Sequence, residues 1–249
     1  AVSSARAQLF VLSVLSSEAT LGLYGSVLQL VQPFAIISNS VVSTTFPSMS
    51  RATKQGKGSQ KKVTEFSVMI LMAVAIPCVI GAFFLGKDLL QFVYGDAQFR
   101  SASVAFIVVS FSLLSESFIR PFSYLMVANH MENINLREVF ITGFFSILLS
   151  IVLIPKYQLM GAAYSFLIVQ IIALVQYGYA LCNKLFIPNI IRMLGVPLIL
   201  GSLMAIVFLI INKGSLEFSA ALTVATLSYL LFSGITFAWM SGRLSKYVG

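Results

Sequence analysis

The sequence predicts an all-α integral membrane protein with about eight transmembrane helices. Hydrophobic residues make up 58% of its 249 residues and charged residues only 10%, whereas soluble domains contain about 45–50% apolar and about 25% charged residues. The apolar residues also form continuous runs that approach or exceed the roughly 20 residues of one helical crossing. Such runs are too long for barrel strands, which alternate over about ten residues. Soluble enzymes and nucleic-acid-binding modules are therefore excluded as descriptions of the whole chain.

Eight apolar runs give the expected helices in order, with boundaries good to a few residues. The second contains Pro33 and is expected to end before Pro47, and Pro155 is expected to stop the fifth, because proline removes a helical hydrogen bond. The first begins directly at Ala1 without the basic region of a signal peptide, so we expect the chain to be the C-terminal part of a longer protein. The expected ranges are 1–15, 19–45, 63–85, 101–128, 138–154, 159–181, 190–211 and 216–240.

The basic residues predict the orientation of these helices. Alternate connections, together with the C-terminal tail, carry ten lysines and arginines, against four in the other connections. The segment between the second and third runs holds five of the ten: Arg51, Lys54, Lys57, Lys61 and Lys62. Short cytoplasmic loops are enriched in bases, so both ends of the chain are expected in the cytoplasm. The net charge of +8 is then a topological signal, and no nucleic-acid partner is needed to explain it.

The chain offers little catalytic chemistry. Its only histidine is His130, and its two cysteines, Cys78 and Cys182, are far apart in apolar surroundings. Neither a zinc-binding spacing nor a nucleophile, phosphate-loop or metalloprotease motif occurs in the sequence. We therefore expect a transporter and not an enzyme, with no catalytic residue, metal or cofactor.

Two charges in the fourth apolar run are not explained by topology. Glu116 and Arg120 lie four residues apart, on one helical face, where they can form an ion pair. One interpretation is an ion pair that is buried between helices. The other is a water-filled cavity in which Arg120 binds an anion, and Pro121 favours it because broken membrane helices tend to line cavities.

A third charge and several amides complete the candidate substrate-binding residues. Arg6 would lie near the midplane of the membrane if its helix continued before Ala1, and would otherwise reach the surface. Polar side chains in membrane helices more often join helices than bind ligands. The amide candidates are Gln29, Gln32 and Gln170, and Asn39 and Gln176 are lesser features of the same kind.

Four motifs in order resemble the polysaccharide transport proteins of O-antigen flippase type, in the multidrug/oligosaccharidyl-lipid/polysaccharide exporter superfamily. The resemblance covers about residues 6–186 and corresponds to the C-terminal half of such proteins. It rests on Leu21-Gly22-Leu23-Tyr24, on Phe46-Pro47-Ser48-Met49-Ser50-Arg51, on Leu89 to Gly95 with Phe99, and on Leu153-Ile154-Pro155-Lys156-Tyr157 followed by Gly161-Ala162-Ala163.

The resemblance implies two six-helix lobes that face each other across a cavity. Residues 1–186 would form the second lobe, and residues 187–249 an additional two-helix hairpin with a cytoplasmic tail. The implied substrate is an oligosaccharide on a polyprenyl pyrophosphate, moved across the bacterial inner membrane by alternating access, with Arg6 and Arg120 facing the pyrophosphate. The implied partners are this lipid-linked glycan, membrane lipids, the missing N-terminal lobe and a glycan polymerase.

Some residues depart from the family pattern. Gln158 stands where glycine usually follows the tyrosine, and Ser146 and Ser150 stand where asparagine is common. The alternatives are a multidrug exporter of the same fold, which would need a cation-attracting cavity, and a membrane-embedded glycan polymerase or a structural subunit. The polymerase would need a large outward loop, whereas the longest here is about residues 86–100.

Overall fold

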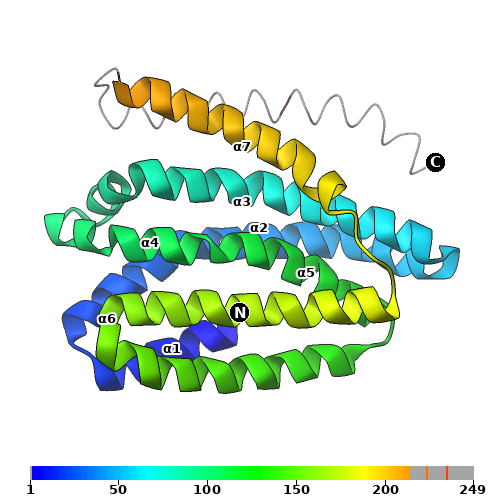
Figure 1. Cartoon of the computed structure of the whole chain (residues 1–249), viewed down its shortest axis with the longest axis horizontal. Helices are drawn as coiled ribbons and strands as arrows, with labels where there is room; N and C mark the ends of the chain where they lie inside the picture. Colours follow the sequence, from blue (N-terminus) through cyan, green and yellow to red (C-terminus); the bar gives the residue numbers. More distant parts are fainter. Residues whose placement is uncertain (1, 214–222, 224–233, 235–249) are drawn as a thin grey trace.

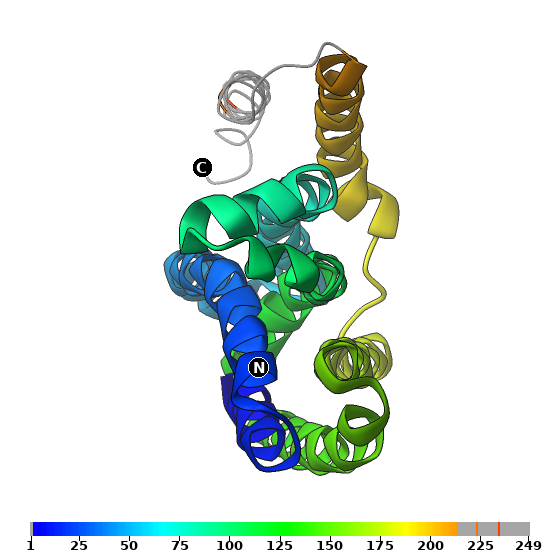
Figure 2. The same ribbon diagram turned by 90° about the vertical axis from the view of Figure 1, so that its left-hand side faces the viewer.

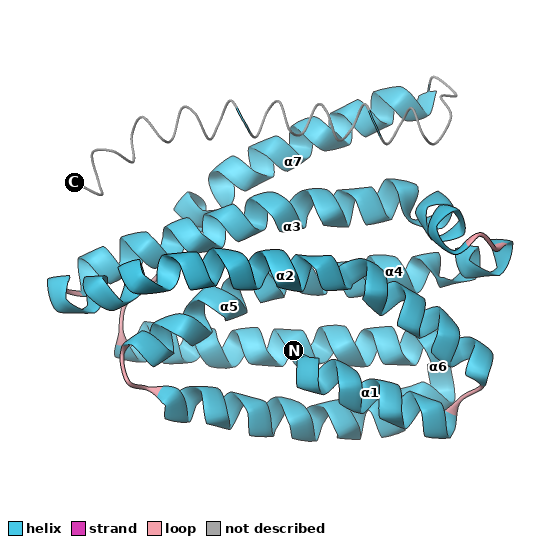
Figure 3. Ribbon diagram, turned by 180° about the vertical axis from the view of Figure 1, so that it is seen from behind, coloured by secondary structure: helices cyan, strands magenta, loops and turns pink. Residues whose placement is uncertain are grey.

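The computed structural model describes residues 2–213, 223 and 234, and among them only helices and short connections occur (Figures 1 and 3). The side chains of residues 2–7 and 211–213 are outside the described part. The elements are α1 (Val2–Leu15), α2 (Glu18–Gln55), α3 (Lys57–Tyr94), the short 3-10 helix η1 (Ala97–Ala102), α4 (Ser103–Ser110), α5 (Ser112–Ala128), α6 (Glu132–Lys184) and α7 (Ile190–Lys213).

Five helical segments of the described chain are long and apolar enough to cross a membrane, which confirms the predicted all-α membrane architecture. The first expected run is the short helix α1, of 14 residues. The expected eighth run, 216–240, lies outside the described residues apart from positions 223 and 234. The five segments are Glu18–Gln55, Lys57–Tyr94, Ala97–Ala128, Glu132–Lys184 and Ile190–Ile210.

Helices α2 and α3 are longer than the apolar runs that predicted them. Each has 38 residues, or about 57 Å at 1.5 Å per residue, against about 30 Å for the hydrocarbon core. The expectation that the second helix ends before Pro47 was wrong, because α2 continues through Pro47 to Gln55. Met49 and Ala52 beyond this proline are buried. Packing therefore keeps the segment helical although its sequence is polar.

Pro121 does not break its helix, contrary to the expectation that favoured a cavity. Helix α5 continues through Pro121 to Ala128, and the irregular position lies earlier, at Phe111 between α4 and α5. The hydroxyl groups of Ser110 and Ser112, on either side of Phe111, donate to backbone carbonyls three residues back. Membrane helices can thus contain proline without a break.

Helix α6 is two helices that meet at one non-helical residue. Gln158 has φ 47° and ψ −118°, and there the chain reverses, so that the two halves of α6 lie side by side (Figures 1 and 2). The expected fifth and sixth helices are these two halves, although the first half continues past Pro155. Three residues on, Gly161 packs so closely on the backbone of Leu153 that a Cβ would overlap it.

The helices run back and forth along the long axis of the molecule (Figure 1). We call the end where α2 turns into α3 at Gly56 the basic end, because Arg51, Lys54, Lys57, Lys61 and Lys62 lie next to that turn. The connection between α6 and α7 lies at the same end, because Asn189 in this connection contacts Glu65 near the start of α3. One apolar cluster, which includes Met72, Leu125 and Met193, joins α3, α5 and α7, while a second, which includes Leu12 and Ile154, joins α1 and α6.

Candidate functional site

Glu116 and Arg120 form the predicted ion pair inside α5. The Nε of Arg120 donates to Oε1 of Glu116 over 3.0 Å, and the Glu116 side chain is 8% exposed. Arg120 is 21% exposed, and its Nε is one of the five N–H donors of a guanidinium group. The predicted pairing is thus confirmed, and a guanidinium group is held inside a helix that can cross the membrane.

A polar network next to this pair joins α5 to both halves of α6. The hydroxyl of Tyr177 donates to Oδ1 of Asn135 over 3.0 Å, and Nδ2 of Asn135 donates to the carbonyl of Ser123 over 3.3 Å. Tyr177, Asn135 and Ser123 thus form a polar contact shared by α5 and both halves of α6. Nothing in the sequence indicates this contact, because Tyr177 and Asn135 are 42 residues apart.

The polar residues of α2 lie on a different surface. Gln29, Gln32 and Asn39 are all exposed in this structure, although α2 is long and apolar enough to span a membrane. Gln29 accepts a hydrogen bond from the Tyr94 hydroxyl over 3.2 Å, at the end of α3 opposite the basic end. Helix α2 thus presents polar groups on a face that the described part of the chain leaves open.

The remaining candidates are not joined to the ion pair. Gln170 is 3% exposed in the second half of α6, and its Nε2 has no hydrogen-bond partner among the described residues, as is also true of Nε2 of Gln176. Arg6 falls within α1, but its side chain lies outside the described part. The structure therefore brings Glu116 and Arg120 together and places Gln29, Gln32 and Gln170 elsewhere.

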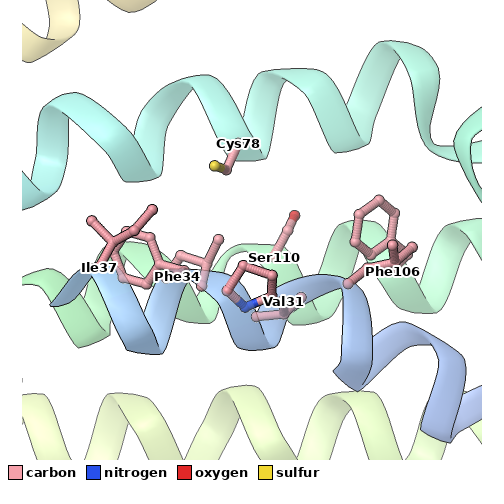
Figure 4. A pocket seen from close by; sticks show the side chains of 9 residues that line it. Val31, Phe34, Ile37, Cys78, Phe106 and Ser110 are labelled. Atoms are coloured by element: carbon pink, nitrogen blue, oxygen red, sulfur yellow. The ribbon is translucent and has the colours of Figure 1, made fainter. Parts of the chain in front are cut away.

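An apolar pocket of about 100 Å³ lies between α2, α3, α4 and α5 (Figure 4). Its lining includes Phe34, Cys78, Phe106 and Ser110, and it contains no charged side chain. None of the five predicted site residues whose side chains are described lines it. This pocket offers nothing that would bind an anionic group, so the guanidinium of Arg120 and the polar face of α2 remain the candidate site.

Glu65 is a buried charge that the sequence analysis missed. Its side chain is 1% exposed, and its Oε1 accepts a hydrogen bond from the backbone N–H of Asn189 over 2.7 Å. Arg192 and Lys61 lie within 3.6 Å and 3.9 Å of the two carboxylate oxygens. We call these four residues the Glu65 cluster. In the sequence Glu65 looks like the acidic end of a basic loop, and nothing there indicates a partner 124 residues away.

Comparison with known proteins agrees with this architecture. The structure of the lipid II flippase MurJ in an inward closed conformation superposes with a TM-score of 0.73 at 18% sequence identity, over 94% of this chain and 50% of that one. The capsular polysaccharide biosynthesis protein CapF of Staphylococcus aureus is 30% identical over 173 residues, which are 68% of this chain and 43% of that protein. The chain thus spans about half the length of the proteins it matches.

The apolar helices and the structural superposition define the class of this protein: it is a multi-pass membrane protein with a flippase-like fold. The model of the family described as lipid II flippase MurJ matches residues 2–240, so the chain belongs to this family. Members of this family are transporters and not enzymes. The resemblance to the exporter superfamily, on which the expectation of a flippase rested, is thereby confirmed.

Proposed function

We propose that this chain is the C-terminal lobe of a flippase that moves a polyprenyl-pyrophosphate-linked oligosaccharide across the bacterial inner membrane. The family supports a lipid-linked substrate, and the capsular polysaccharide relative supports a glycan for surface polysaccharide synthesis. Residues 1–186 would form the six-helix lobe and residues 187–249 the additional hairpin and tail, which makes eight spans with both chain ends in the cytoplasm.

The guanidinium of Arg120, paired with Glu116 inside a helical segment long and apolar enough to cross a membrane, is the observation that carries this proposal. A charge at the centre of a membrane helix costs roughly 2.5–3.5 kcal/mol, and such charges usually mark substrate or ion pathways. A guanidinium group binds phosphate oxygens with a pair of parallel hydrogen bonds. Glu116 accepts a hydrogen bond from Nε of Arg120. It would thereby orient the guanidinium toward the pyrophosphate.

The exposed polar face of α2 supports a second lobe. Gln29, Gln32 and Asn39 are exposed here, and amide groups that face lipid without hydrogen-bond partners are unfavourable, as Gln32 and Asn39 would be. We infer that the missing N-terminal lobe faces them across a water-filled cavity, with Arg6 and Gln170 as further candidates toward the substrate. Movement of the two lobes about this cavity would give alternating access. A glycan polymerase that receives the exported units is a candidate partner.

The multidrug alternative is disfavoured by the same geometry. A cavity for cationic drugs needs an acidic group that is available to the drug. In this lobe the Glu116 carboxylate is already paired with Arg120 at 3.0 Å. The carboxylate is therefore not available to a cationic drug, whereas the remaining guanidinium N–H donors of Arg120 can bind an anionic ligand.

Substitutions at Arg120 in the full-length protein test the proposal. We expect Arg120→Ala to abolish export of the surface glycan at matched protein levels in the membrane. Arg120→Lys should restore only part of it, because an ammonium group cannot reproduce the pair of parallel hydrogen bonds. The measurement is surface glycan per cell, with each variant quantified in the membrane fraction.

A double variant distinguishes ligand binding from a structural ion pair. Glu116→Gln with Arg120→Gln removes both charges and leaves no stranded partner, so a merely structural pair would be dispensable in it. We expect no export from this variant because the cation is needed by the ligand. Export at the wild-type level would remove Arg120 from the substrate site.

A further inference from the structure

The Glu65 cluster joins two parts of the chain that the sequence separates widely. Glu65 lies in the third turn of α3, and Asn189 and Arg192 lie at the start of α7. We propose that Glu65 fixes the start of α7 on α3, so that α7 moves as one body with the helices that precede it. This inference does not depend on which lipid the protein moves.

The contact at Asn189 connects the carboxylate to the first turn of α7. Asn189 precedes the helix, and its Oδ1 accepts from the backbone N–H of Arg192 over 3.2 Å, as an N-cap residue does. Its own backbone N–H donates to Oε1 of Glu65 over 2.7 Å. A carboxylate at a helix N-terminus also interacts favourably with the helix dipole. Glu65 therefore completes the cap of α7 from another helix.

The two basic neighbours of Glu65 reinforce this arrangement to different extents. Arg192, in the first turn of α7, lies 3.6 Å from Oε2, and Lys61, one turn before Glu65 in α3, lies 3.9 Å from Oε1. Both bases are partly exposed, whereas the carboxylate is almost fully buried. Burying a carboxylate is costly unless its partners compensate. The site thus adds a directional polar contact to the apolar packing of α7 on α3.

Further along, α7 keeps contact with α3. Gly201 lies so close to Ile76 that a Cβ at this position would overlap the Ile76 side chain. Toward the other end, the rings of Phe84 and Phe208 stack at 5.3 Å with an angle of 8° between their planes. Helix–helix contacts in membranes depend on such close approach, because lipid supplies no hydrophobic driving force between helices. Glu65 fixes the start of an interface that these contacts continue.

Hydrogen exchange at the start of α7 tests the inference directly. In full-length protein in lipid nanodiscs, we expect Glu65→Ala to raise exchange of the Asn189 and Met193 amides by about tenfold or more, since a charge-assisted hydrogen bond is lost. Glu65→Gln should raise it less, because its amide oxygen still accepts from Asn189. Glu132→Ala is the matched control, since Glu132 is an exposed acid in the first turn of α6, and should change nothing.

The pattern along the chain decides the outcome. An increase confined to residues 186–196 supports the inference. Unchanged exchange at Asn189 in both Glu65 variants would overturn it. An equal increase in α2, α5 and α7 would also overturn it, because it would show that Glu65 serves overall stability and not the position of α7. If Glu65→Ala does not accumulate, the nearly isosteric Glu65→Gln gives the same readout with a smaller change.

Discussion

Glu65 and Glu116 are both nearly fully buried and each faces an arginine, but their partners differ in origin and in exposure. Glu116 pairs with Arg120 from the same helix, one turn away. Glu65 faces Lys61 from its own helix, Asn189 just before α7 and Arg192 in the first turn of α7. Arg120 is 21% exposed, whereas Arg192 is 57% exposed. The first carboxylate compensates a charge inside one helix, and the second joins two helices.

The exposure of the cation determines how much each carboxylate contributes to the stability of the fold. If Glu116 is removed, Arg120 is left without a counter-charge in a segment that can cross the membrane. If Glu65 is removed, Arg192 and Lys61 can extend into the surrounding water, and the loss is the hydrogen bond to Asn189. Breaking a buried pair is costly mainly through the charge that stays buried. The two sites should therefore respond differently to equivalent substitutions.

The largest expected effect is at Glu116. We expect Glu116→Ala to lower the free energy of unfolding by about 3 kcal/mol, because a guanidinium group is stranded in the membrane. Arg120→Ala should cost less, about 1 kcal/mol, since a stranded carboxyl group can bind a proton whereas a guanidinium does not release one. The measurement is equilibrium unfolding of the full-length protein in mixed micelles with a denaturing detergent.

The order of these two losses is the critical result. If Arg120→Ala costs as much as Glu116→Ala, Arg120 contributes packing or hydrogen bonds beyond its charge, and the comparison fails. Glu116→Gln is the control of shape, because it keeps the side-chain volume and removes only the charge. Its free energy of unfolding should be close to that of Glu116→Ala.

The two sites also differ in how far they could be predicted from the sequence. The Glu116–Arg120 pair was predictable because helical residues four apart always share a face. Most helices were predictable because apolar runs of sufficient length cross a membrane as helices. The partners of Glu65 were not predictable, since their proximity depends on how α7 packs on α3. The ends of α2 were missed for a related reason, because buried Met49 and Ala52 keep it helical beyond its apolar run.

At Gln158 the backbone conformation is unfavourable, whereas at Glu65 and Glu116 the unfavourable feature is a buried charge. Its φ of 47° with ψ −118° is a conformation that favours glycine, and the family resemblance expects glycine there. We expect Gln158→Gly to raise the free energy of unfolding by about 1 kcal/mol, because relief of the strain exceeds the entropic cost of glycine. Gln158→Ala is the control and should give no gain, since alanine also carries a Cβ. Equal gains from both would show that the glutamine side chain, not the backbone, is unfavourable.

The smallest expected effect is at Lys61, and it separates two explanations of the Glu65 cluster. Lys61 is 37% exposed and lies 3.9 Å from the carboxylate, and pairs of this kind contribute about 0–1 kcal/mol. We therefore expect Lys61→Ala to change the unfolding free energy by less than about 0.5 kcal/mol and to leave exchange of the Asn189 amide within about twofold of wild type. If Lys61→Ala instead matched Glu65→Ala at Asn189, Glu65 would act by balancing the charge of the basic end. A small effect of Lys61 beside a large effect of Glu65 would assign the position of α7 to the hydrogen bond at Asn189.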